Sequence, residues 1–275
     1  MDPSSLPKAG QETSPKVALS FAGFDPTGGA GLLADLKVFE ALGLWGVALP
    51  SGLTAQNSAG VSAVTAVELS VLRPLYQSLI ADIPLAGVKL GMLCDRPQVE
   101  LAVELLAQVP GPKVLDPVLV SSSGFALLSE TGVRLMVAEL LPLVDLITPN
   151  LREVTALCGL TVRGPQDLKR AAEAILRLGA KAVLVKGGHL DGEPLDLYLG
   201  PEGLVEFRDR RVEGKDPHGT GCLLSSLVLG LVLQGRSWTQ GIGEAKQQVT
   251  RLIRTARPVG QGKPYWDLRS LKVDQ

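Results

Sequence analysis

The sequence predicts an α/β protein of three layers, in which a central, mostly parallel sheet carries helices on both faces. From residue 16 onward, short apolar runs typical of strands alternate with longer segments of helical period. Such alternation is the signature of βαβ units, whose strands pair in parallel. No linker rich in proline or glycine and no internal repeat interrupts it, so we expect one domain over residues 16–275. The polar, proline-containing segment 1–15 is expected to be a disordered tail.

The first part of the chain supplies most of the expected parallel strands. Runs rich in valine, leucine and alanine predict strands at 16–22, 46–49, 61–67, 87–91 and 113–116. Apolar residues three and four apart predict helices at 33–42, 70–81 and 97–108. Gly43 is placed to end the first of these helices, because glycine accepts the left-handed conformation that commonly follows a helix.

The later part of the chain continues the alternation and then adds a hairpin. Helical period predicts helices at 130–141, 150–158, 165–178, 219–234 and 238–254. The first of these ends before Pro142, because proline interrupts helical hydrogen bonding. Buried strands are expected at 143–148 and 182–186, and an antiparallel hairpin at 195–199 and 204–208. Residues 260–275 are irregular and are expected to lie along the surface.

Composition excludes several classes of protein. The formal net charge is −1, which gives no electrostatic reason to expect nucleic acid or an anionic membrane as a partner. The three cysteines, Cys94, Cys158 and Cys222, are odd in number and widely spaced, so neither a disulfide framework nor a zinc site is expected. The N-terminus lacks the regions of a signal peptide, and 222–233 is too short to span a bilayer. A reduced, cytoplasmic location fits best.

The most informative stretch is Asp216–Cys222, which opens a long apolar helix. Two glycines flank Thr220, and unpaired backbone N–H groups at a helix N-terminus form a ready site for an anion. Cys222 lies in a field that favours its thiolate, so an anion site beside a potential base suggests phosphoryl transfer. The alternative is a simple helix cap with a buried, inert cysteine.

A second glycine-rich segment, residues 22–31, joins the first expected strand to its helix. The carboxyl end of a strand is where open α/β sheets bind ligands, and glycine lets the backbone approach a ligand closely. The segment matches neither the dinucleotide fingerprint nor the Walker loop, so a tight turn is an equal alternative. Asp35 follows one turn later and, taken alone, is typical of a solvated helical aspartate.

Polar side chains also follow other expected strands. Gln56 and Asn57 could read the edge of a heteroaromatic ring or form a turn, and Asp116 could hold a metal or begin a turn. Asn150 and Glu153 have the spacing of a helix capping box, which would satisfy both residues structurally. Lys186 lies at the end of an expected strand and is followed by two glycines. A lysine in this place could bind a phosphate as a point charge. The two histidines, His189 and His218, each adjoin a glycine pair and could contact phosphate, although ring packing or a backbone hydrogen bond is the simpler role for both.

Taken in order, these segments resemble the hydroxymethylpyrimidine/phosphomethylpyrimidine kinases of the ribokinase superfamily. The resemblance rests on AGFDPTGGAGLLADLKVF, TAQNSAGV, KLGML, LDPV, ITPNLREV, LVKGGH and HGTGC, and extends from about residue 16 to residue 254. It implies a ribokinase-like fold and an ATP-dependent kinase that phosphorylates 4-amino-5-hydroxymethyl-2-methylpyrimidine and then its monophosphate, for thiamin biosynthesis. It also implies Mg²⁺ as cofactor and a homodimer, and it leaves open whether a monovalent cation is required.

The resemblance assigns a role to each matching position. It implies that Gly23, Asp35 and Gln56 hold the pyrimidine and that Met92 and Val118 line its pocket. Asn150 and Glu153 match a motif associated with Mg²⁺ and phosphate, and Asp116 would join the metal, partly through water. Lys186 and Thr220 would bind the ATP phosphates, the backbone of Gly219, Thr220 and Gly221 would form the anion hole, and Cys222 would be the base.

Several positions depart from the family pattern. Phe24, Pro217 and Gln261 stand where serine, threonine and histidine are expected, Ser51 and Gly52 stand where threonine and alanine are expected, and Lys263 is an added residue near the C-terminus. They leave pyridoxal kinase as the nearest alternative activity, because its substrate carries a similarly placed alcohol. A non-catalytic pyrimidine sensor of the same fold is the alternative from another class. A nicotinamide oxidoreductase is improbable because the dinucleotide fingerprint is missing.

Overall fold

The predicted three-layer α/β fold is confirmed. The computed structural model describes residues 14–121, 124–188, 190 and 192–271, so most of the predicted tail, and His189, lie outside the described residues. A single sheet runs through the molecule in the order β3-β2-β1-β4-β5-β6-β7-β8-β9. Its strands are β1 Val17–Phe24, β2 Trp45–Gln56, β3 Val61–Ala66, β4 Gly87–Leu90, β5 Lys113–Leu115, β6 Leu146–Ile147, β7 Val183–Gly187, β8 Leu195–Gly200 and β9 Gly203–Arg208.

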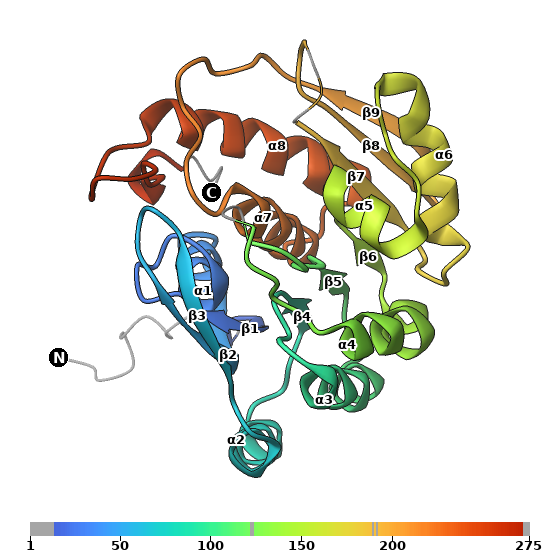
Figure 1. The fold of residues 1–275 in the computed structure, drawn as a ribbon. Coiled ribbons are helices and arrows are strands. Elements are labelled where there is room, and N and C mark those ends of the chain that lie inside the picture. Colours follow the sequence, from blue (N-terminus) through green and yellow to red (C-terminus); the bar gives the residue numbers. More distant parts are fainter. Residues whose placement is uncertain (1–13, 122–123, 189, 191, 272–275) are drawn as a thin grey trace, which may run out of the picture.

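Parallel pairing joins β2 through β7, whereas β3 at one edge and the β8–β9 hairpin at the other pair antiparallel. Helices cover both faces of the sheet (Figure 1). One face carries α1 Gly31–Ala41, α7 Thr220–Leu233 and α8 Trp238–Thr255. The other carries α2 Leu69–Asp82, α3 Arg96–Gln108, α4 Glu130–Leu135, α5 Leu151–Cys158 and α6 Pro165–Leu176.

Alternation along each strand divides the core into two layers. In β7, Leu184 packs with α7 and α8, while Val183 and Val185 face the opposite layer of helices. This is the period of two that a sheet buried on both faces requires. Helix α7 is buried along nearly its whole length, including Ser225 and Ser226. Among the described residues, no helix is both long and apolar enough to cross a membrane.

The predicted elements differ from the observed ones mainly around Pro142. The expected helix 130–141 is an α-helix only to Leu135, and it continues as a π-turn from Met136 to Leu140. Pro142 then lies in a short 3-10 turn, so the expected strand 143–148 shrinks to β6. Strand β2 is longer than expected because its outer half pairs with β3, and Gln56 therefore belongs to the strand rather than to a following loop.

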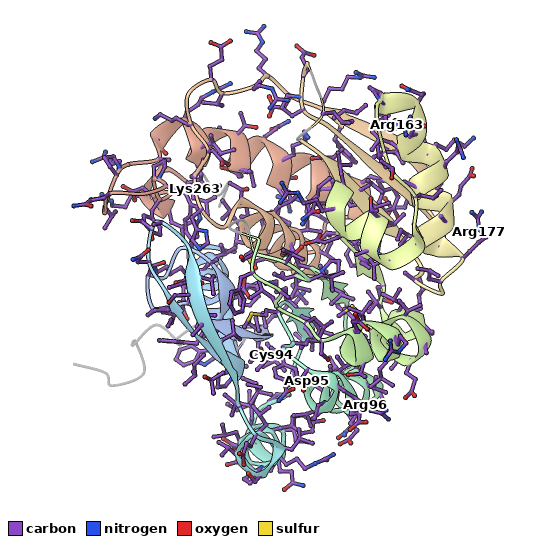
Figure 2. All side chains as sticks on the ribbon, in the orientation of Figure 1. Cys94, Asp95, Arg96, Arg163, Arg177 and Lys263 are labelled. Carbon is purple, nitrogen blue, oxygen red and sulfur yellow. The ribbon has the colours of Figure 1, made fainter. Side chains whose placement is uncertain are left out.

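Residues 260–267 are irregular, as expected, and a short 3-10 turn follows at Leu268–Ser270. The segment around Trp266 lies over the glycine-rich segment 22–31. Trp266 is buried and its indole N–H donates to the carbonyl of Gly29, 3.1 Å away. Tyr265 pairs with Arg257 in an isolated bridge. Lys263 bonds through its backbone to Ser58 at the tip of the β2–β3 hairpin, and Figure 2 shows it at the periphery of the molecule. Tyr265 and Trp266 therefore cover one side of the glycine-rich segment 22–31.

Candidate active site

The two glycine-rich segments pack directly against each other. Gly219 has a φ of +79°, and a side chain there would overlap the carbonyl oxygen of Gly29. Gly31 also has a positive φ, and a side chain there would overlap the carbonyl of Gly23. Only glycine permits both this conformation and this approach. We call residues 22–31 the glycine loop and Gly219–Cys222 the anion-hole segment.

Lys186, Asp116 and the anion-hole segment meet at the carboxyl ends of the strands. Lys186 Nζ lies 2.7 Å from Asp116 Oδ1, and both side chains are nearly buried. A β-carbon built on Gly221 would lie 3.2 Å from Lys186 Nζ and 3.5 Å from Asp116 Oδ2. The cation and the carboxylate therefore face the N-terminus of α7 at van der Waals distance. Burial alone would lower the pKa of Lys186. The attraction of its ammonium to Asp116 and Glu153 outweighs this effect and raises the pKa, so Lys186 is charged at neutral pH.

Asn150 and Glu153 form the capping box that their spacing predicts. The backbone N–H of Asn150 donates to Glu153 Oε2 at 2.7 Å, and the N–H of Glu153 donates to Asn150 Oδ1 at 3.0 Å. Burial raises the pKa of Glu153 to about 7; Lys186 opposes this rise and Asp116 adds to it. Glu153 is thus close to the Lys186–Asp116 pair and keeps one carboxylate oxygen outside the capping box.

The carboxylates fit a magnesium ion that is shared with substrate phosphates. Among the residues that the structure describes, no three His, Cys, Asp or Glu side chains gather as a metal site. Asp116 and Glu153 alone would leave most positions around the ion to water and phosphate. Mg²⁺ is usually bound in that way, through one or two carboxylates.

Asp35 lies beneath the site and is fully buried. Lys89, which is also fully buried, places its Nζ 2.8 and 3.0 Å from the two Asp35 oxygens. The hydroxyls of Ser20 and Ser226 each donate to Asp35 at 2.6 Å. Both carboxylate oxygens are thus engaged within the protein, and direct contact of Asp35 with a pyrimidine stays a prediction. Lys89 was not singled out from the sequence, although it lies in the KLGML motif.

Cys222 lies at the start of α7, as predicted, but its thiolate is not favoured. Burial raises the pKa of the thiol to about 11; Lys89 and the N–H of Gly31 lower it, while Asp116 and Asp35 raise it further. The expectation that the helix N-terminus makes this cysteine acidic is therefore wrong for the protein without ligands. Desolvation and the two carboxylates raise the pKa of the thiol by more than Lys89 and the N–H of Gly31 lower it.

Gln56 is tied to the glycine loop through His218. The Gln56 amide nitrogen lies 3.1 Å from His218 Nε2, which lies 3.2 Å from Asp25 Oδ2. His218 Nε2 donates to the Asp25 carboxylate in the tautomer that carries a proton there, and it accepts from the Gln56 amide in the other tautomer, so the two contacts alternate with the tautomer of His218. Asp25 also accepts from the N–H groups of Thr27 and Ala30. His218 thus does more than pack, although its ring also meets Tyr265 edge-on. The adjoining HGTGC and FDPTGG motifs were the available signal for the contact.

The residues expected to line the pyrimidine pocket lie at the same edge of the sheet. Met92 is buried, and a β-carbon on Gly23 would overlap its methyl group, so the absence of a side chain at Gly23 makes room for Met92. Val118 is half-buried and bonds through its N–H to the carbonyl of Asp116. Among the departures from the family pattern, Phe24 is half-buried, Pro217 is buried and Gln261 is exposed.

Comparison with known proteins gives a consistent result. A family model described as phosphomethylpyrimidine kinase matches residues 25–266. A hydroxymethylpyrimidine/phosphomethylpyrimidine kinase from Aquifex aeolicus is 40% identical over 253 residues, which are 91% of this chain and 99% of the relative. The enzyme of the same name from Salmonella typhimurium is 39% identical over 249 residues, 90% of this chain and 94% of the relative.

Solved structures of two kinds of kinase share the fold. A phosphomethylpyrimidine kinase from Clostridium difficile superposes with a TM-score of 0.75 at 35% identity, covering 86% of this chain and 98% of the other. A pyridoxal kinase from Staphylococcus aureus in complex with ADP superposes with a TM-score of 0.85 at 27% identity, covering 93% of this chain and 94% of the other. The same staphylococcal enzyme is known in complex with AMP-PCP and pyridoxal.

Proposed function

The chain belongs to the phosphomethylpyrimidine kinase family, and we propose that it phosphorylates 4-amino-5-hydroxymethyl-2-methylpyrimidine and then the resulting monophosphate, with ATP as donor, in thiamin biosynthesis. The observation that carries the proposal is the meeting of Lys186, Asp116 and the anion-hole segment at the N-terminus of α7. Phosphoryl transfer requires positioning and neutralisation of charge more than covalent chemistry, and this arrangement provides both.

The phosphate side of the site consists of one cation and one row of backbone donors. Lys186 balances charge on the transferred phosphoryl group, while the N–H groups of Gly219, Thr220 and Gly221 bind its oxygens. Asn150 orients Glu153 through the capping box, and Glu153 and Asp116 would hold Mg²⁺, partly through water. When bound, Mg²⁺ supplies further positive charge beside the phosphates. The resemblance leaves the requirement for a monovalent cation open.

The two steps make different demands on Cys222. In the first step the nucleophile is an alcohol, and Cys222 Sγ, as thiolate, accepts its proton while the alcohol oxygen attacks the γ-phosphorus. In the second step the nucleophile is a phosphate oxygen that is already ionised, so no base is needed. Because the thiol pKa is about 11, the first step is expected to accelerate as pH rises through the neutral range.

The pyrimidine is expected to bind between the glycine loop and strand β2. Gly23, Met92 and Val118 surround the ring, Gln56 reads its polar edge, and Asp35 supports the site from below. A homodimer through the strands that follow Gly46 remains an expectation from the family resemblance. Small-molecule substrates, without nucleic acid or membrane partners, and a cytoplasmic location complete the proposal.

The proposal is tested with purified protein, Mg-ATP and hydroxymethylpyrimidine, with the products separated by mass. Sequential appearance of the mono- and diphosphate is expected. The similarity in fold to a pyridoxal kinase at a TM-score of 0.85 makes pyridoxal the matched second substrate. Turnover of pyridoxal alone would identify the protein as a pyridoxal kinase. No turnover of either substrate would indicate a non-catalytic pyrimidine-binding protein.

A further inference from the structure

A fully buried ion pair lies beneath the proposed active site, and no step described above uses its cation. Lys89 and Asp35 are both completely shielded from solvent, and Lys89 Nζ lies 2.8 Å from Asp35 Oδ2. Removing two charges from water is costly, and a buried pair of this kind often adds little stability compared with apolar residues of the same size. Its presence at this place therefore calls for an explanation other than stability.

The pair lies against the helix that carries Cys222. Ser226 donates to Asp35 Oδ1 at 2.6 Å, and it follows Cys222 by four residues. Residues four apart share one face of a helix, so the face of α7 that carries Cys222 is turned toward the pair. Gly91 leaves room for the ammonium, since a β-carbon there would lie 3.1 Å from Lys89 Nζ.

We propose that Lys89 is a positioning residue for the first phosphorylation, in which its buried ammonium stabilises the Cys222 thiolate that accepts the proton of the substrate alcohol. The proposal rests on the proposed function. The proton balance is simple: the thiol first loses its proton to water, and the thiolate then takes the alcohol proton as the oxygen–phosphorus bond forms. The bond from the γ-phosphorus to ADP breaks in the same step.

Four charged groups act electrostatically on Cys222, and they come from different elements. Lys89 on β4 and Lys186 on β7 favour the thiolate, whereas Asp35 on α1 and Asp116 after β5 oppose it. Lys186 is paired with Asp116 at 2.7 Å and faces the phosphate side of the site. After burial itself, Lys89 has the largest influence on the pKa of the thiol, and it lowers that pKa. No other cation among these groups is free of a phosphate role.

The decisive experiment is a double-mutant cycle of Lys89→Met and Cys222→Ala, with kcat measured separately for both phosphorylations. Lys89→Met is expected to lower the first step about tenfold at pH 7 and to move its pH profile about one unit upward, since one pKa unit is tenfold in thiolate. The second step is expected to change less than threefold. In the Cys222→Ala background, Lys89→Met should cause no further loss specific to the first step. Equal losses in both steps, or a selective loss that persists without Cys222, would overturn the proposal.

A second measurement covers the case in which Lys89→Met does not fold with Asp35 unpaired. The variant Asp35→Asn/Lys89→Met removes both charges, and the rate of Cys222 alkylation by iodoacetamide is followed by peptide mass from pH 7 to 10. Slower alkylation than in the parent at each pH is expected, because Lys89 outweighs Asp35 at the thiol. An unchanged rate would overturn the proposal. If the parent protein phosphorylates no pyrimidine, the proposed function fails, and the alkylation rates still test the effect of Lys89 on Cys222.

Discussion

Two Lys–Asp pairs of the same length lie at opposite ends of the parallel strands. Lys186 and Asp116 are 2.7 Å apart beyond the carboxyl end of β5, with 14% and 3% of their side chains exposed. Lys181 and Asp145 are also 2.7 Å apart, at the amino ends of β6 and β7, but 57% and 21% exposed. Since the bond lengths agree, an ion-pair distance by itself does not mark a functional site.

What separates the two pairs is their surroundings. Lys186 and Asp116 face the backbone of Gly221 and lie close to the buried Glu153. The pair Lys181–Asp145 lines an open hollow of about 560 Å³, together with residues such as Lys16, Lys113 and Trp238. In water, charges are screened and a pair contributes little. In the nearly buried site, where little water screens them, the same charges act strongly on a group that binds next to them.

Removing the charge of Lys186 is expected to have the largest effect on the rates of both phosphorylations. Lys186→Met should lower kcat about 1,000-fold for both phosphorylations, because it removes the side-chain charge that stabilises the transferred phosphoryl group. The measurement is steady-state kinetics on each substrate with Mg-ATP. A loss below tenfold would show that the anion-hole segment acts without Lys186. It would also mean that the buried Lys186–Asp116 pair matters no more for activity than the exposed Lys181–Asp145 pair.

Removing the thiol is expected to slow the first phosphorylation much more than the second. Cys222→Ala should lower the first phosphorylation about 100-fold, the range of a lost general base, and the second less than tenfold. The parent's first step should also rise with pH, because its thiol pKa of about 11 leaves little thiolate at neutrality. Rates of both steps between pH 6.5 and 9.5 provide the check. Equal losses in the two steps would exclude Cys222 as a base.

Neutralising Glu153 is expected to lower the activity and to raise the stability of the folded protein. Glutamine keeps the capping box, so Glu153→Gln removes mainly a buried negative charge. The folded protein holds this proton up to about pH 7, compared with an ordinary pKa of 4.5, so the free energy of unfolding of the parent should fall as pH rises between these values. Glu153→Gln should abolish this fall and be more stable at pH 8 by on the order of 1–3 kcal/mol. Its kcat should fall about tenfold.

Urea unfolding at pH 5 and pH 8 without ligands measures this effect. Parent and Glu153→Gln should differ more at pH 8 than at pH 5. A difference that is the same at both pH values would mean that Glu153 is ionised throughout.

Removing the charge of the exposed Lys181 is expected to have the smallest effect on activity and stability. Lys181→Met takes away one partner of a pair that water already screens, so stability should change by less than about 0.5 kcal/mol. Both values of kcat should stay within about twofold of the parent. The variant is the matched control for Lys186→Met, and a large loss of activity would show that the amino edge of the sheet contributes to the reaction.

The layer arrangement and the outline of the site could be predicted because both depend on local sequence. Periods of two and of 3.6 residues predicted nearly every strand and helix, and the capping box of Asn150 and Glu153 followed from spacing alone. The interruption around Pro142 was less predictable. The same apolar residues suit a helix, a π-turn or a strand, and only packing against the sheet decides among them.

The chemistry-bearing residues that were missed share one property: their partners are distant in the sequence. Lys89 bonds to Asp35, which is 54 positions away, and His218 bonds to Asp25, which is 193 positions away. A lysine inside a strand gives no local sign that its ammonium is buried. Asp35 was expected to meet substrate, whereas the fold surrounds it with a lysine and two serine hydroxyls.

By itself, the sequence determined the fold class, the positions of the glycines and the motifs that mark the family. These follow from backbone conformation and short-range hydrogen bonding, which a few neighbouring residues control. The tertiary structure alone decided which charges are buried together, and therefore that Cys222 is a weak acid and that Lys186, unlike Lys181, faces the anion-hole segment. Burial and electrostatic coupling arise only when distant segments pack, because both depend on how much water the packing removes.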